Sequence, residues 1–330
     1  MICSTLRVNR ARRSASIAQT FARVKSRMFQ EMNKLNELTS VHNPKVKKWV
    51  TLRLHKYRQK TGLFLVEGAR FVAEALLTQQ PIEAIIYCES LLRTDRARHI
   101  IQSAPSDIVW RVNEEIAKRL SERDDPGEVF CVCRHVDVPL DALPQEDTPL
   151  FIVLDEPRGP GNLGITIRTA EGAGADALII IEPAVDLYHP TVVQTTVGSL
   201  FGFPIARASS RQAFLDWYDQ TWGARPETRC IAAVPEAEQD YANLDDLTRP
   251  VFVLFGNEER GLAPELRKRA HVEISIKMLG RADSLNTASA AAVIICDIVR
   301  KRGHGRFALP QHLRVQKGFE QPGKSSKKIG

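Results

Sequence analysis

The 330-residue chain contains no apolar run near the about 20 residues that cross a bilayer, so nothing in it predicts a membrane protein. Its six cysteines are too few for a disulfide scaffold in a chain of this length. Cys131 and Cys133 form a C-x-C pair without a second Cys/His pair at zinc spacing, which favours packing in the core over metal binding. We therefore expect a globular protein of a reducing compartment, without a metal site.

Acidic residues are missing from the start of the chain, where Glu31 is the first. Arginine and serine dominate this stretch, a composition typical of an organellar transit peptide and equally of a basic disordered arm. A start codon placed too early, with Met28 or Met32 as the true start, would look the same. We expect residues 1–40 to be a disordered extension and the protein to be cytoplasmic, with a mitochondrion or plastid as the alternative. The basic, Gly- and Pro-containing residues 303–330 predict a disordered tail.

Acids are also absent from residues 44–60, PKVKKWVTLRLHKYRQK, for which we predict a single basic helix over 46–59. The segment has seven Lys/Arg, with Trp49 and Tyr57 interleaved. One interpretation is a solvated helix face. The other is an RNA-binding surface, with cations for phosphate and aromatic rings for base stacking. The contact residues would then be Lys45, Lys47, Lys48, Arg53, Lys56 and Arg58.

Strand-like runs alternate with helical patterns over residues 41–135 and again over residues 150–302, which predicts two α/β domains. In the second domain the strand candidates, such as FIVLD, ALIIIE and VFVLFG, are near-continuous apolar runs. Such runs are expected for parallel strands that are covered on both faces. Residues 136–149 combine proline and acids without periodicity, which is typical of a linker.

Three loops that contain glycine follow strand candidates of the second domain: EPRGPGNLGITIRTA, NEERGLAPE and KMLGRADSLNTASA. Because parallel strands present their carboxyl ends at one edge of a sheet, we expect these loops to meet there. The first loop also spells G-x-G-x-x-G, the dinucleotide fingerprint. However, Pro160 removes a backbone N–H from the phosphate cradle, and this reading leaves the other two loops unexplained. In the third loop we expect Ser284 to be the N-cap of a final helix over 285–302.

The three loops resemble the signature motifs of the SpoU/TrmH-type RNA 2′-O-ribose methyltransferases of the SPOUT superfamily. N-x-G-x-x-x-R-T-A corresponds to residues 162–170, G-x-E-x-x-G-L to 256–262, and S-L-N-x-S/A-x-A to 284–290. The preceding domain is similar to the L30e-like substrate-binding domain found in this family. The resemblance implies an α/β fold: a SPOUT-type parallel sheet with a deep C-terminal trefoil knot, preceded by a small L30e-like domain.

The resemblance also implies the reaction, the methylation of a ribose 2′-hydroxyl in structured RNA by S-adenosylmethionine. The cofactor would lie against Gly256, Ile276 and Leu285. The family is typically homodimeric, with Arg168 of one chain near the cofactor of the other. Because a guanidinium stays protonated, we expect Arg168 to clamp phosphate and stabilise a developing alkoxide instead of acting as a base. The implied catalytic set is Asn162, Arg168, Glu258, Ser284 and Asn286.

Two other functions remain open at this point. A non-catalytic RNA-binding protein, such as a ribosome-assembly factor, would bind RNA without transferring a methyl group. A nicotinamide-dependent oxidoreductase would bind NAD and would not respond to S-adenosylmethionine. Among RNA substrates, the L30e-like domain favours ribosomal over transfer RNA by analogy.

Overall fold

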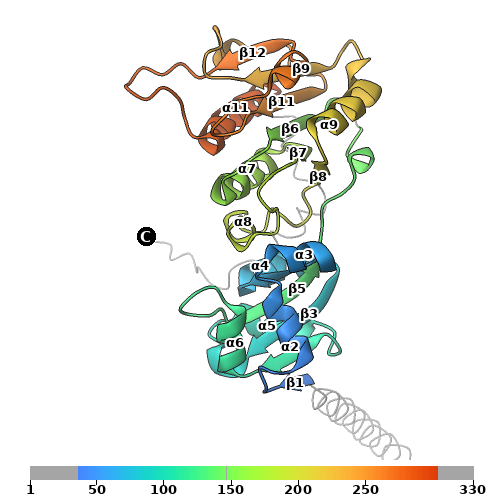
Figure 1. The fold of residues 1–330 in the computed structure, drawn as a ribbon, viewed down its shortest axis with the longest axis vertical. Helices are drawn as coiled ribbons and strands as arrows, with labels where there is room; N and C mark the ends of the chain where they lie inside the picture. Colours follow the sequence, from blue (N-terminus) through green and yellow to red (C-terminus); the bar gives the residue numbers. More distant parts are fainter. Residues whose placement is uncertain (1–35, 146, 304–330) are drawn as a thin grey trace, which may run out of the picture. The chain divides into compact units, whose positions relative to one another are not determined.

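The computed structural model describes residues 36–145 and 147–303 (Figure 1), which fall into two compact units. The first unit contains the chain up to Asp137 together with residues 163–168 and 185–202, and the second contains the rest. The possible transit peptide and the basic tail lie outside the described residues. The prediction of a disordered extension over residues 1–40 is wrong for residues 36–38, because β1 (Asn36–Leu38) pairs in parallel with β4 (Val109–Val112).

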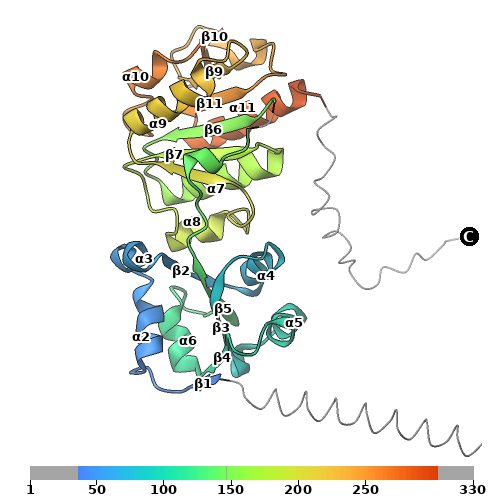
Figure 2. The same cartoon turned by 90° about the vertical axis from the view of Figure 1, so that its right-hand side faces the viewer.

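The first unit is built on a five-stranded mixed sheet in the order β1-β4-β3-β5-β2. The helices α2 and α6 cover one face of this sheet, and α4 and α5 cover the other (Figure 2). The remaining strands and the helices of this layer are β2 (Leu63–Glu67), β3 (Ile82–Cys88), β5 (Val129–Arg134), α2 (Pro44–Thr51), α4 (Ala69–Leu77), α5 (Asp95–Ser103) and α6 (Glu114–Leu120).

The basic segment forms two helices, α2 and α3 (His55–Thr61), instead of the single helix predicted over 46–59. Leu52 is the C-cap of α2 and is buried. Leu54, directly before α3, has an extended backbone. The helical spacing of apolar residues therefore stops at Leu52. Trp49 is only 4% exposed and packs edge-to-face on Trp110 at 5.9 Å, so it is a core residue and the prediction that it stacks on bases is wrong.

The second unit is built on a seven-stranded, fully parallel sheet in the order β10-β12-β9-β11-β6-β7-β8. The continuous apolar runs predict most of these strands, but not the two-residue β10. Aromatic residues of α9 pack on one face around Phe151 and Phe252, and α11 lies on the opposite face (Figure 2). The elements are β6 (Leu150–Asp155), β7 (Ala177–Ile181), β8 (Ile205–Ala208), β9 (Arg229–Ala233), β10 (Gln239–Asp240), β11 (Val251–Phe255), β12 (Val272–Ser275), α9 (Arg211–Tyr218), α10 (Pro264–Arg267) and α11 (Thr287–Lys301).

The helix α7 (Pro160–Ala173) follows β6 and carries the first motif. Proline suits its first turn, where the missing N–H has no helical partner. Gly164 lies against α8 (Pro190–Thr195). A Cβ atom at this position would collide with the Thr195 side chain and come within 2.8 Å of the Val192 carbonyl oxygen. The motif glycine therefore permits a close helix–helix approach.

Over residues 36–145 and 147–303, no helix combines the length and the apolar character needed to cross a membrane. In the same part of the chain, no three His, Cys, Asp or Glu side chains gather as metal ligands. Cys131 and Cys133 are fully buried on β5, where burial raises the pKa of the Cys131 thiol.

Candidate active site

The three glycine-bearing loops meet through one chain of side-chain hydrogen bonds. Asn162, at the start of α7, donates from Nδ2 to Oε1 of Glu258 in the loop after β11, at 3.2 Å. Asn286, in front of α11, donates from its own Nδ2 to Oδ1 of Asn162 at 2.9 Å. Residues separated by about a hundred positions or more are thereby joined at the carboxyl edge of the parallel sheet, as predicted from the strand pattern.

Glu258 connects the second loop to the first. Its carboxylate accepts hydrogen bonds from the backbone amides of Arg158, at 3.1 Å, and Gly159, at 3.5 Å. Burial raises the pKa of Glu258, but hydrogen bonds from its own amide, from Asn162 and from these two amides outweigh burial and leave the pKa lowered. Glu258 therefore stays ionised and keeps its hydrogen bonds to the first loop across the neutral pH range.

Asn286 caps the final helix, and the prediction that Ser284 does so is wrong. The Asn286 Oδ1 accepts hydrogen bonds from the amides of Ala288, at 2.9 Å, and Ser289, at 3.4 Å. Because α11 begins at Thr287, two residues later than predicted, the cap falls on the residue immediately before it. The same amide thus orders the helix end with its oxygen and Asn162 with its nitrogen.

A cavity of about 350 Å³ opens beside this chain of hydrogen bonds. Its volume is in the range of small-molecule sites. Gly256, Ile276 and Leu285, the three residues expected at the cofactor, line it together with Ser284. A Cβ atom at Gly256 would overlap the Leu262 amide and lie 2.7 Å from the Gly261 carbonyl oxygen, so the turn requires glycine. Apolar walls next to exposed backbone groups fit the adenosine part of S-adenosylmethionine.

Asn257 shapes the turn between the two glycines of the second motif, and its role was not predicted. It is buried and donates from Nδ2 to the Glu156 carbonyl oxygen at 2.6 Å. Its Oδ1 accepts from the amides of Glu259, at 2.9 Å, and Arg260, at 3.2 Å. Its place between Gly256 and Glu258 in the motif was the signal available in the sequence.

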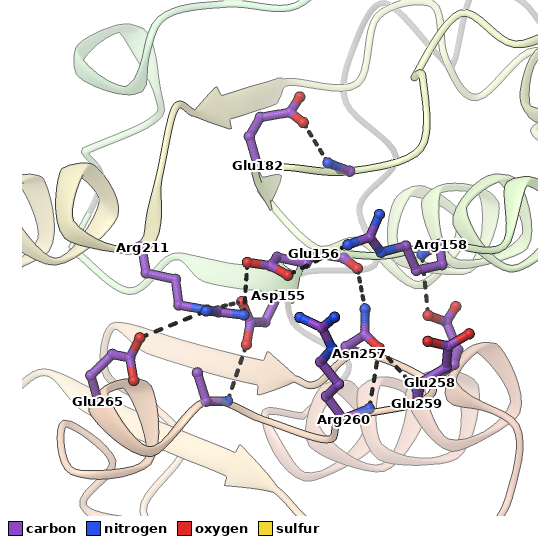
Figure 3. Close-up of polar contacts among 12 residues, drawn as sticks. Asp155, Glu156, Arg158, Glu182, Arg211, Asn257, Glu258, Glu259, Arg260 and Glu265 are labelled. Carbon is purple, nitrogen blue, oxygen red and sulfur yellow. Dashed lines mark hydrogen bonds and ion pairs between the residues drawn. The ribbon is translucent and has the colours of Figure 1, made fainter.

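A buried ion-pair cluster supports the same edge of the sheet, and no sequence pattern indicated it. Figure 3 shows Arg211 reaching towards Asp155, Glu156 and Glu265. The Arg211 guanidinium lies 2.8 Å from a carboxylate oxygen of each of the first two. Asp155 also accepts from the Ala263 amide at 3.1 Å, which ties the end of β6 to the loop after β11. Burial raises the pKa of Asp155, although Arg211 opposes the shift.

Arg168 is exposed on α7, two turns beyond Asn162. Within the described residues its guanidinium makes no hydrogen bond or ion pair. A conformationally free cation at a motif position is available for an anionic substrate.

Arg58 is not available for RNA, and its prediction as an RNA contact is wrong. Its side chain is 3% exposed, and its Nη2 lies 2.6 Å from a carboxylate oxygen of Asp186. Its Nη1 donates to the carbonyl oxygens of Leu52, at 2.7 Å, and Arg53, at 2.8 Å. A charge that would be costly to bury alone is thus fully paired, and it closes the end of α2.

The other five basic side chains predicted to contact RNA are exposed. Three of them have local partners: Lys45 lies over the Trp110 ring, Lys48 is 3.7 Å from Glu83, and Arg53 is 3.6 Å from Glu122. Lys56 lies 5.0 Å from the centre of the ring of its half-buried neighbour Tyr57. Lys47 has no partner among the described residues.

A parallel sheet with three loops around a nucleoside-sized cavity defines an α/β enzyme that binds its cofactor at the carboxyl edge. A model of the SpoU rRNA Methylase family matches residues 149–296, and a model of the MRM3-like substrate binding domain matches residues 43–131. The chain is 30% identical over 267 residues to the 23S rRNA (uridine(2479)-2′-O)-methyltransferase of Streptomyces viridochromogenes, which covers 81% of this chain and 93% of the relative. It is 27% identical over 271 residues to the 23S rRNA (guanosine(2553)-2′-O)-methyltransferase RlmP of Bacillus subtilis, covering 79% and 98%.

Solved structures agree. The SpoU methyltransferase AviRb from S. viridochromogenes in complex with AdoMet is similar with a TM-score of 0.73 and 30% identity, over 80% of this chain and 100% of that one. The AdoMet-bound rRNA methyltransferase from Sinorhizobium meliloti has a TM-score of 0.72 and 31% identity, over 80% and 97%. The chain belongs to the SpoU family and is an RNA 2′-O-ribose methyltransferase that uses S-adenosylmethionine.

Proposed function

We propose that the enzyme methylates one ribose 2′-hydroxyl of ribosomal RNA, with the three-loop site as its active site. The hydrogen-bonded chain Glu258–Asn162–Asn286 beside the 350 Å³ cavity carries the proposal. The two relatives from S. viridochromogenes and B. subtilis are both named 23S rRNA 2′-O-methyltransferases, which supports this substrate. S-adenosylmethionine supplies an activated methyl group, so the enzyme's own task is to hold the hydroxyl and polarise it.

In this proposal Asn162, Glu258 and Asn286 keep the three loops in one arrangement. Asn162 uses its oxygen and one N–H in that arrangement. Its second N–H is left to contact the substrate ribose. Ser284 lines the cavity and can donate to either ligand. Arg168 binds the phosphate next to the target ribose and stabilises negative charge as the 2′-oxygen loses its proton.

The proposal includes a homodimer and the trefoil knot that the family resemblance implies. Exposed apolar side chains on the two motif-bearing helices support the dimer: Ile165 on α7 is 46% exposed and Val293 on α11 is 37% exposed. Similarity to SpoU-type structures supports the knot. We also propose a cytoplasmic location. The unbridged thiols of Cys131 and Cys133, whose sulfurs lie 3.4 Å apart, fit a reducing compartment.

The test is to incubate the purified protein with total RNA and labelled S-adenosylmethionine and then to map blocked 2′-hydroxyls. We expect label at one position in ribosomal RNA. Label confined to transfer RNA would overturn the substrate assignment. RNA binding without any label would favour an assembly factor, and stabilisation by NAD alone would favour an oxidoreductase.

Lys47 and Lys56, the least engaged of the lysines predicted to contact RNA, give a prediction for RNA binding. If Lys47 and Lys56 contact phosphates, changing either to alanine will weaken the binding of RNA whatever its sequence. Each change will also reduce the magnitude of the slope of log K against log salt concentration by about 1. Filter binding across a salt series measures this slope. Arg96→Ala is the matched control, because Arg96 is an exposed cation of α5, on the opposite face of the same sheet. An equal loss of slope in the control would show a nonspecific charge effect and contradict the assignment.

A further inference from the structure

The wall of the cavity away from Asn162 contains a fixed carboxylate. Glu236, in the loop after β9, and Arg267, on α10, both line the cavity. Arg267 forms a two-pronged ion pair with Glu273, with its Nε at 2.7 Å and its Nη2 at 2.6 Å from the two oxygens. Its remaining prong, Nη1, donates to Oε1 of Glu236 at 2.6 Å.

This arrangement leaves Glu236 with an unused oxygen in a fixed place. Arg267 orients the carboxylate through Oε1, and Glu273 in turn fixes the plane of the guanidinium. The hydrogen bonds that Arg267 donates to Glu273, and then the one to Glu236, raise the pKa of Arg267 against the effect of its burial. Two carboxylates share one cation, so negative charge remains at the cavity wall.

We propose that Glu236 binds the ribose of S-adenosylmethionine by accepting hydrogen bonds from its vicinal hydroxyls. The assignment deepens the proposed active site and rests on it. A carboxylate has only acceptors, and each of its oxygens has two lone pairs, so the free Oε2 and the second lone pair of Oε1 suit a pair of neighbouring O–H donors. None of the three motifs includes Glu236, which lies in the loop between β9 and β10.

The position of the Glu236 loop relative to the strands indicates that Glu236 binds the ribose of the cofactor and not its ammonium group. Its loop follows β9, and β11 separates β9 from β6 in the strand order. The hydroxyl-binding side of the site, with Asn162 and Glu258, lies over β6 and β11. The transferable methyl must face that side, so the nucleoside part extends towards β9 and β12. Ile276, after β12, supplies an apolar wall there for adenine.

Glu236→Gln tests the assignment with two ligands. The amide of glutamine has one oxygen, which Arg267 will hold, so an N–H donor will face the ribose hydroxyls. We expect S-adenosylhomocysteine and 5′-methylthioadenosine, which lacks the amino-acid part, to bind about 10-fold more weakly and by the same factor. Isothermal titration calorimetry measures both dissociation constants. Because Glu236 is 63% exposed, we expect the variant to fold with an unchanged unfolding midpoint.

Glu238→Gln is the matched control, since Glu238 is an exposed carboxylate two residues further on that does not line the cavity. Unchanged affinity of Glu236→Gln for both ligands would overturn the assignment. Weakening of S-adenosylhomocysteine alone would overturn it too and assign Glu236 to the ammonium group. If the unmodified protein bound neither ligand, the proposed active site itself would fail, and this assignment with it.

Discussion

Arg168→Ala will lower kcat by about 10²–10³-fold and leave the affinity for S-adenosylmethionine unchanged. Arg168 is exposed and makes no hydrogen bond or ion pair within the described residues, so its removal takes away no contact of the fold. What the variant loses is a cation beside the reacting hydroxyl. Arg168→Lys will retain the charge but lose the planar guanidinium group, and its kcat will lie between those of the unmodified enzyme and Arg168→Ala. Single-turnover methylation of the RNA target, with calorimetric cofactor binding, measures both quantities.

Mixing variants tests whether Arg168 acts in the partner subunit's site. Gly256→Val will lose cofactor binding, because the turn has no room for a side chain. If the two sites of a dimer each combine residues of both chains, mixing Arg168→Ala with Gly256→Val will restore activity in part.

Arg300→Ala is the matched control for Arg168→Ala and will keep normal activity, because Arg300 is an exposed arginine on α11 paired with Asp297. Activity of Arg168→Ala within a few fold of normal would refute the clamp.

The sequence alone predicts this site well because the site is built from backbone turns. The loops after β6, β11 and β12 carry glycine and short polar side chains in a fixed order, and parallel strands bring their carboxyl ends together. The meeting of Asn162, Glu258 and Asn286 follows from that rule. The helix cap was misplaced by two residues because serine and asparagine are equally good caps and only the backbone decides between them.

Long-range charge pairing, in contrast, could not be predicted. Arg58 belongs to the same basic segment as several exposed lysines, and nothing in the local sequence distinguishes it from them. Its partner Asp186 is 128 positions away. Arg211 and Asp155 are 56 positions apart, and neither belongs to a motif. Helical periodicity also left open which residues of the basic segment face the core, so Trp49 was assigned to the wrong side. Each of these errors concerns a side chain whose burial depends on the tertiary fold.

Arg211→Met will lower the stability of the second unit by about 3 kcal/mol, a drop of roughly 6–12 °C in its unfolding midpoint. The Asp155 side chain is fully buried and that of Glu156 is 8% exposed. The Arg211 guanidinium lies 2.8 Å from both carboxylates, whereas Arg158 lies 3.8 Å from Glu156. Removing one partner of a buried pair leaves uncompensated charge. Differential scanning calorimetry measures the midpoint. Arg269→Met, which breaks the exposed pair with Asp219, is the control and will hardly change it.

The pH dependence of the Arg211→Met defect separates buried charge from lost packing. Burial already raises the folded-state pKa of Asp155, and the loss of Arg211 will raise it further. For an acid with a raised folded-state pKa, stability is fully present below the unfolded-state pKa and is lost as pH rises through the folded-state pKa. The defect of the variant will therefore be larger at pH 8 than at pH 5. Adding Asp155→Asn removes the charge, keeps an acceptor for the Ala263 amide, and will recover part of the loss at pH 8. A defect of the same size at both pH values, unchanged by Asp155→Asn, would mean that Arg211 stabilises this edge by packing alone.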